Sequence, residues 1–177
     1  MAGVTLAELQ ERHNTGRVVR ALPNAAAEVG KSYTPWTAST RITEDDRSVV
    51  RTIFESCGIQ DEVPGERDID YLTGLTGSGP AFPALLAAAM LKDALGRGLP
   101  PAIAHRAVRA VIAGAAGLLE QKDQAPAEIV EAFLDYRGTT AAGIEAMRKA
   151  GFDRAVSAGL AAAFETAMRI GGSASRD

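Results

Sequence analysis

The sequence changes character near residue 67, and this change limits the folds that the chain can adopt. The part before it alternates short segments, which predict helices at 5–12 and 43–57 and strands at 17–22, 32–37 and 59–63. The part after it has helical periodicity throughout, with helices predicted at 80–97, 101–122, 126–134, 139–149 and 152–170. This order predicts a few α/β elements followed by an all-helical domain.

The three predicted strands are too few and too short to form a well-covered sheet by themselves. The long helices are rich in alanine and glycine, and they need a further surface against which to pack. We therefore expect that residues 1–67 are the end of a larger sheet domain, or that the chain pairs with another protein.

Composition argues against several classes of partner. The net charge is −3 and aromatic residues make up 5% of the chain, which disfavours nucleic acid. Apolar runs such as 84–91 are too short to span a bilayer. The single cysteine, Cys57, fits a reducing cytoplasm and favours a structural thiol over a catalytic pair with His13 or His105. We predict a cytoplasmic protein with neither a metal site nor a membrane partner.

Two stretches of small and hydroxyl-bearing residues stand out, at 70–82 and 137–143. Each offers backbone N–H groups and hydroxyls at a predicted helix start, which is the local chemistry for holding an anion. Two such stretches in one small chain predict a site for a carboxylate or a phosphate.

Four segments follow one another in a characteristic order, namely RVVRALPN at 17–24, LTGLTGSGPAF at 72–82, GLP at 98–100 and GTTAAG at 138–143. The segment KAGF at 149–152 extends the last of them. In these segments the chain resembles the pyrroline-5-carboxylate reductases, the enzymes of the last step in proline synthesis. The resemblance runs from about residue 2 to residue 170, which is nearly the whole chain.

The resemblance implies a mainly α fold. It implies a helical dimerisation domain of the 6-phosphogluconate dehydrogenase C-terminal-like type at 68–172, preceded at 1–67 by the last α/β elements of a Rossmann domain and followed at 173–177 by a flexible tail. No Gly-x-Gly-x-x-Gly segment follows a strand in this sequence. A shortened reading frame, a split gene and a deliberately shortened chain are all compatible with this pattern.

Site residues also follow from the resemblance. Gly138, Thr139 and Thr140 would hold the substrate carboxylate, and Thr73 would be the catalytic residue that hydrogen-bonds near the ring nitrogen or the nicotinamide. Asn24, after Pro23, would lie beside the nicotinamide carboxamide of NADP or NAD. The alternative is that each threonine and glycine simply caps a helix.

The chain departs from the family pattern just before Gly138. The usual Ser-Pro-Gly-Gly is replaced here by Asp-Tyr-Arg-Gly at 135–138. Asp135 would repel a substrate carboxylate, whereas Arg137 would offer it a bidentate partner. The two side chains could equally pair with each other. The usual Pro-Asn-Thr-Pro-Ala has also become Pro-Asn-Ala-Ala-Ala at 23–27. These departures indicate a divergent relative whose preferred imine differs.

The resemblance therefore implies reduction of 1-pyrroline-5-carboxylate to L-proline with NAD(P)H, by a homodimer or larger homo-oligomer in the cytoplasm. Two alternatives stay open at this point. The chain could be a catalytically inactive oligomerisation module, or it could belong to a reductase of a different cyclic imino acid.

Overall fold

The structure is a computed structural model that describes residues 3–121, 124–135 and 137–174. The chain is mainly helical, as predicted. Its elements are α1 (Leu6–His13), β1 (Val19–Ala21), a 3-10 helix η1 (Ala25–Val29), β2 (Ser32–Ala38), α2 (Glu44–Glu55), β3 (Gly58–Glu62), α3 (Glu66–Leu72), a π-helical turn η2 (Thr73–Gly77), α4 (Ala81–Gly96), α5 (Pro101–Gln121), α6 (Pro126–Asp135), α7 (Thr139–Lys149) and α8 (Phe152–Ala174). They form two compact units, unit 1 (Met1–Pro80 with Ala158–Asp177) and unit 2 (Ala81–Ser157).

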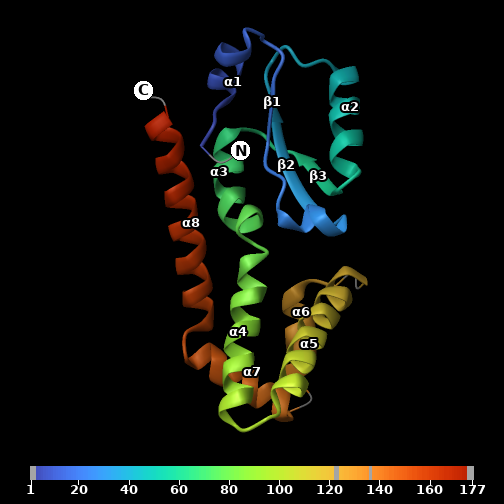
Figure 1. Cartoon of the computed structure of the whole chain (residues 1–177), viewed down its shortest axis with the longest axis vertical. Coiled ribbons are helices and arrows are strands. Elements are labelled where there is room, and N and C mark those ends of the chain that lie inside the picture. Colours follow the sequence, from blue (N-terminus) through green and yellow to red (C-terminus); the bar gives the residue numbers. More distant parts are fainter. Residues whose placement is uncertain (1–2, 122–123, 136, 175–177) are drawn as a thin grey trace. The chain divides into compact units, whose positions relative to one another are not determined.

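Unit 1 is built around a three-stranded sheet in the order β1-β2-β3. Strand β2 pairs antiparallel with β1 and parallel with β3. Helix α2 covers one face of the sheet, and α1 and α3 lie on the other (Figure 1). Trp36, in the central strand, is fully buried, and its indole N–H donates to Gln60 Oε1 over 2.7 Å. The core of unit 1 therefore centres on β2.

Strand β1 is shorter than the sequence predicted because its neighbour cannot complete the ladder at either end. The Leu22 N–H donates to Pro35 O over 3.0 Å, but Pro35 has no N–H to donate in return. At the other end the Val18 N–H donates to the Ser39 hydroxyl over 3.1 Å instead of to a backbone carbonyl. A proline in a central strand is thus tolerated here because it marks the point at which β1 ends.

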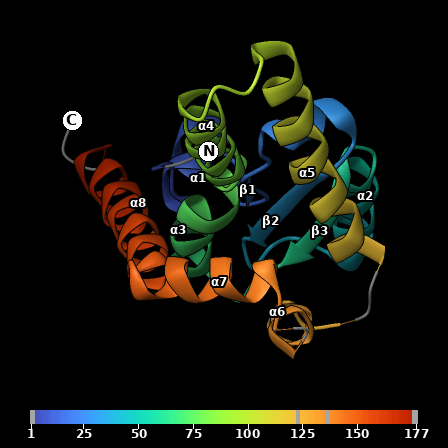
Figure 2. The ribbon, with the colours of Figure 1, turned by 90° about the horizontal axis from the view of Figure 1, so that it is seen from below.

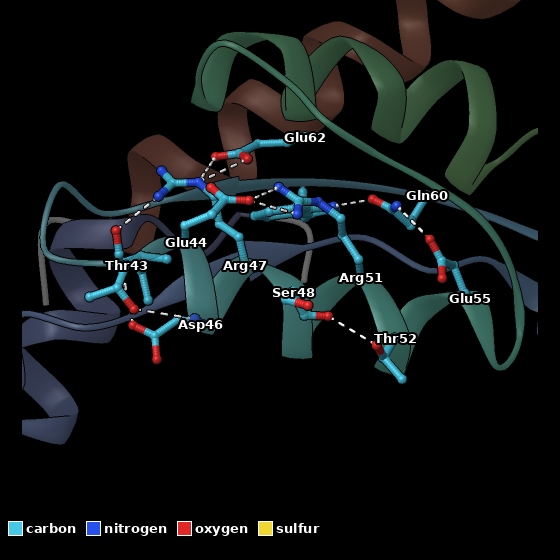
Figure 3. Close-up of polar contacts among 12 residues, drawn as sticks. Thr43, Glu44, Asp46, Arg47, Ser48, Arg51, Thr52, Glu55, Gln60 and Glu62 are labelled. Carbon is cyan, nitrogen blue, oxygen red and sulfur yellow. Dashed lines mark hydrogen bonds and ion pairs between the residues drawn. The ribbon is translucent and has the colours of Figure 1, made fainter.

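Helix α2 begins at a capping box and is joined to the sheet by a surface ion pair (Figure 3). Thr43 and Asp46 form a capping box, and Arg47 Nε lies 2.9 Å from Glu62 Oε1 on β3. Hydrogen bonds from the Thr43 backbone N–H, then from Arg17 and the Thr43 hydroxyl, lower the pKa of Asp46 to about 2. These contacts are exposed and orient the helix more than they stabilise it.

One glycine allows β2 and β3 to approach each other. Gly58 has a φ of +151°, and a Cβ at this position would lie 2.0 Å from Ser32 O. Any side chain here would collide with the backbone of the paired strand, so this position requires glycine.

Helix α3 and the turn η2 pack between the sheet and the part of α8 that belongs to unit 1. Ile69 of α3 is fully buried. Gly74 of η2 is buried, and a Cβ there would lie 3.2 Å from Ala163 Cβ. The rings of Tyr71 and Phe164 meet edge to face, with centroids 5.9 Å apart. Small residues in η2 therefore let α8 come close.

Unit 2 is wholly helical in its described residues. Helix α4 packs against α5, and α6 packs against α7 (Figure 2). Arg148 of α7 lies 3.6 Å from Glu131 of α6. Few apolar residues of this unit are buried, and those that are have small side chains, namely Ala104, Val108 and Ala141. A thin core of this kind leaves most of the apolar side chains of these helices exposed.

The regular elements that the sequence predicted are all present. Helix α8 continues to Ala174. The predicted flexible tail at 173–177 stays a prediction, and 175–177 lie outside the described residues. The predicted domain boundary at 67/68 is a matter of family architecture and stays a prediction. Within one chain the compact units divide after Pro80 and inside α8.

Candidate functional site

The segment 70–82, which we expected to lie at the start of a helix, is itself helical over most of its length. Helix α3 runs directly into the π-helical turn η2, in which the Ser78 N–H donates to Thr73 O over 3.0 Å. The Thr73 and Thr76 hydroxyls donate to Ile69 O and Leu72 O, each over 2.8 Å. These groups are satisfied within the helix, because hydroxyl side chains can return a hydrogen bond to the preceding turn.

Thr73 is half-buried at the start of η2. Because its hydroxyl hydrogen is given to Ile69 O, only its two oxygen lone pairs are left for a ligand. In this geometry the hydroxyl can accept a hydrogen bond from an N–H group and cannot donate one. π-Helical turns occur frequently at functional sites, which is consistent with the predicted role.

Asn24 lies just beyond β1 and is tied to the same turn. Its Nδ2 donates to Thr76 O over 3.0 Å, and its Oδ1 accepts from the Ala26 N–H over 2.9 Å. The second of these hydrogen bonds links Asn24 to η1, because Asn24 is the N-cap of that helix. One amide hydrogen and one lone pair are left for a further partner. The structure thus joins Asn24 to the turn that contains Thr73, and Pro23 is exposed beside it.

A buried arginine that sequence reasoning missed lies two positions before Leu22. The Arg20 side chain is 3% exposed, with Nη1 at 3.0 Å from Glu66 Oε1 and Nη2 at 2.6 Å from Asp70 Oδ1. Its Nε is buried without a hydrogen-bond partner. The available signal was a charged residue within an otherwise apolar strand, VVRAL, because such a residue must find a partner when the strand is buried.

The second predicted segment begins a helix, as expected. Helix α7 starts at Thr139, after Gly138 as its N-cap. No side chain caps this end, and Thr139 and Thr140 are exposed, so the first backbone N–H groups and both hydroxyls face solvent. The arrangement can hold an anion such as a carboxylate.

Asp135 and Arg137 are exposed on the approach to Gly138, and Tyr136 between them lies outside the described residues. Arg137 has a φ of +46°, in the left-handed region that favours glycine. Within the part of the chain that the structure describes, no ion pair joins Asp135 to Arg137. The proposed pairing of these two side chains is therefore not formed.

The candidate residues fall into two groups. Pro23, Asn24 and Thr73 belong to unit 1, whereas Asp135, Arg137 and 138–140 belong to unit 2. Cys57 is half-buried and its thiol donates to Phe54 O over 3.2 Å, a local structural contact. Among residues 3–121, 124–135 and 137–174, no group of His, Cys, Asp and Glu could hold a metal ion.

The long helices expose much apolar surface. Two helical stretches, Glu66–Gly96 and Pro101–Gln121, are long and apolar enough by length and composition alone to cross a membrane, which differs from the expectation that the apolar runs are too short. Helices that are covered by another protein surface pass the same test. The exposed apolar side chains in α4 and α5 include Leu85, Val111, Leu118 and Leu119.

Comparison with known proteins gives a consistent result. The family model of the pyrroline-5-carboxylate reductase dimerisation domain matches residues 66–170. A pyrroline-5-carboxylate reductase of Synechocystis is 33% identical over 171 residues, which cover 97% of this chain and 64% of the relative. One from Thermus thermophilus is 35% identical over 172 residues, covering 97% and 63%.

Solved structures agree. A pyrroline-5-carboxylate reductase from Coxiella burnetii has a TM-score of 0.89 at 25% identity, covering 96% of this chain and 63% of that one. A pyrroline carboxylate reductase from Plasmodium falciparum with NADP bound has a TM-score of 0.83 at 26% identity, covering 96% and 68%. The chain spans less than two thirds of the length of the Synechocystis and Thermus relatives.

Proposed function

The chain belongs to the pyrroline-5-carboxylate reductase family, and we propose on this ground that the protein reduces 1-pyrroline-5-carboxylate to L-proline with NADPH or NADH. The observation that carries the proposal is the match of the dimerisation domain over 66–170, the part of the chain that holds Thr73 and Gly138. The predicted division into 1–67 and 68–172 is part of the same proposal.

The reaction needs three things from the protein. It must hold the substrate carboxylate, orient the C=N bond, and stabilise the proton on the ring nitrogen. We assign the first task to 138–140, because the uncapped start of α7 presents backbone N–H groups and two threonine hydroxyls to solvent.

Thr73 serves the ring nitrogen in this proposal. The hydroxyl already donates to Ile69 O, so it can only accept, and its partner must be an N–H group. A protonated imine carries such a group, and the product amine carries one as well. Thr73 would therefore stabilise and orient the protonated ring and would not itself supply the proton.

The described residues fit one end of a dinucleotide. Asn24 retains an amide hydrogen and a lone pair, which suit a carboxamide, and Pro23 offers an exposed ring beside it. The nicotinamide would supply the hydride for the imine carbon when it is bound. Asn24 would hold the carboxamide and so fix which face of the ring is presented. The choice between NADP and NAD is not made by these residues.

We further propose that the protein is a homodimer or a larger homo-oligomer. The support is the dimerisation family model together with the exposed apolar side chains of α4 and α5. Covering those side chains with a second copy would remove from water the surface that unit 2 leaves open. The cytoplasmic location predicted from the single cysteine stays a prediction.

The activity is tested on the full natural protein by following NADPH oxidation with 1-pyrroline-5-carboxylate. We expect turnover in the wild type and a loss of about 10- to 100-fold in kcat for Thr73→Val, which removes one hydrogen bond to a charged ring but keeps the side-chain shape. Thr52→Val is the matched control, because the Thr52 hydroxyl makes the same bond to the preceding turn, to Ser48 O over 3.0 Å, in α2. Absence of imine reduction in the wild type would contradict the proposal.

A second candidate substrate is favoured by the segment before Gly138. Arg137 adds a cation and Asp135 an anion next to the proposed carboxylate site, and they do not neutralise each other as an ion pair. A reductase of a different cyclic imino acid, with a further polar group, would suit this pair. The same assay with six-membered and hydroxylated cyclic imino acids decides it, because a higher kcat/KM for one of them identifies the preferred ring.

A further inference from the structure

We propose that Arg20 is a positioning residue, which holds Thr73 and Asn24 in register through an alternating row of contacts. The inference rests on the proposed function, because Thr73 and Asn24 are the residues that it would position. Arg20 itself reaches neither substrate nor cofactor in this proposal, since its guanidinium is enclosed by the protein.

The row consists of Arg20, Leu22 and Asn24, which occupy alternate positions of one extended segment and hence share one face. Each of the three contacts the facing helical stretch formed by α3 and η2. Arg20 pairs with Glu66 and Asp70 of α3, and Leu22 Cδ2 lies 3.2 Å from the place where Gly77 would carry a Cβ. Asn24 Nδ2 donates to Thr76 O. We call these three residues the contact row.

Thr73 lies between the points that the contact row holds. Thr73 follows Asp70, which Arg20 binds, by about one helical turn. It precedes Thr76 and Gly77, which Asn24 and Leu22 contact. A shift of α3 along the strand would therefore move the Thr73 hydroxyl relative to the Asn24 amide. Within the contact row, the ion pairs of Arg20 fix the position of α3 along the strand most strictly. The reason is that a planar guanidinium fixes the positions of two carboxylates at once.

The burial of Arg20 is also an inefficient way to increase the free energy of unfolding. Its side chain is 3% exposed, whereas those of Glu66 and Asp70 are 34% and 24% exposed. Its Nε–H is buried without a partner, which carries a desolvation cost that an apolar side chain of similar size would not have. Glu66 Oε1 additionally accepts from the Leu6 N–H over 2.9 Å, so the same carboxylate also fixes the start of α1.

The kinetic test uses a double-mutant cycle in the full natural protein, with Arg20→Met and Thr73→Val. We expect Arg20→Met to lower kcat about 10- to 100-fold, because a small displacement of a catalytic group has that effect, and to change the KM for the imine far less. In the Thr73→Val background the same substitution should cost less than about threefold in kcat. Arg20→Lys should recover only part of the loss, since an ammonium cannot hold both carboxylates in a fixed plane.

A merely structural role predicts a different result. In that case Arg20→Met would reduce kcat by the same factor in both backgrounds, and this outcome would overturn the proposal. Ser39→Ala is the matched control for general damage to β1, because Ser39 is buried and bonds Val18 N and Gly16 O at the other end of the strand. It should lower the melting temperature and leave the kcat unchanged.

Hydrogen exchange separates this proposal from the proposed function. We expect Arg20→Met to raise amide exchange in 73–78 at temperatures where the protein is folded, and Ser39→Ala to leave that segment unchanged. If the wild type reduces no cyclic imine, the proposed function fails, and the exchange result still decides whether Arg20 fixes this turn. Unchanged exchange in 73–78 would overturn the positioning role.

Discussion

At the scale of single residues, Arg137 is notable because it adopts a backbone conformation that side chains disfavour. Its φ of +46° is held between α6 and α7, where its N–H donates to Leu134 O over 3.1 Å. The left-handed conformation costs a non-glycine residue about 1–2 kcal/mol. Arg137→Gly should therefore raise the free energy of unfolding by about 1 kcal/mol, which denaturant titration measures.

Asn14 provides the control for this prediction. It has a similar φ of +47° at the end of α1, but asparagine tolerates the left-handed region far better than arginine. Asn14→Gly should consequently change the free energy of unfolding much less. An equal gain at both positions would show that the strain assigned to Arg137 is wrong.

Local residue chemistry was predictable from the sequence, and distant pairing was not. The capping box of Thr5 and Glu8 joins residues only three positions apart, a spacing that is visible in the sequence itself. The partners of Arg20 lie 46 and 50 residues away, so nothing near Arg20 in the sequence indicates them. The helix start at Thr139 could likewise be predicted from its own small residues, whereas the side-chain bond from Asn24 to Thr76 could not.

At the scale of elements, the approach of η2 to α8 depends on a missing side chain. A Cβ at Gly74 would lie 3.2 Å from both Ala163 Cβ and Phe164 N, and 3.3 Å from Leu160 O. Gly74→Val should lower the free energy of unfolding by about 2 kcal/mol, because a branched side chain has no room against the α8 backbone. Thermal unfolding followed by circular dichroism measures the loss.

Gly159 is the matched control, since it lies in α8 within the same unit and a Cβ there meets nothing within 4 Å. Gly159→Val should cause no comparable loss, because valine is a slightly better helix former than glycine. Similar losses at both positions would mean that helix composition, and not close packing at Gly74, controls the stability.

The type of most elements was predicted well because periodicity is local, but the 3-10 helix η1 and the π-helical turn η2 were not predicted. The glycines and threonines of LTGLTGSG indicated the start of a helix, where such residues are common, and not its continuation. In the structure the buried position of Gly74 and the bonds from two threonine hydroxyls keep the segment helical. Packing against α8, which is distant in sequence, decides its conformation.

At the scale of the whole molecule, the exposed apolar surface of unit 2 predicts self-association. Size-exclusion chromatography with light scattering should give a dimer or a larger assembly, and a well-folded monomer would contradict this expectation. Leu85 of α4 is 71% exposed, and Leu85→Glu should shift the protein toward the monomer by placing a charge at the covered surface.

Val49 of α2 is the control, because it is 59% exposed but belongs to unit 1, outside the helical domain. Val49→Glu should leave the assembly unchanged. Dissociation by both variants would show that the dimer is not formed through unit 2.

The arrangement of unit 1 has a consequence for biosynthesis. Its residues come from Met1–Pro80 and from Ala158–Asp177, with the whole of unit 2 encoded between them. During synthesis the segment around Gly74 therefore leaves the ribosome long before the helix α8 that covers it. The surface of that segment stays exposed, and accessible to chaperones, until the part of α8 around 160–164 has been synthesised.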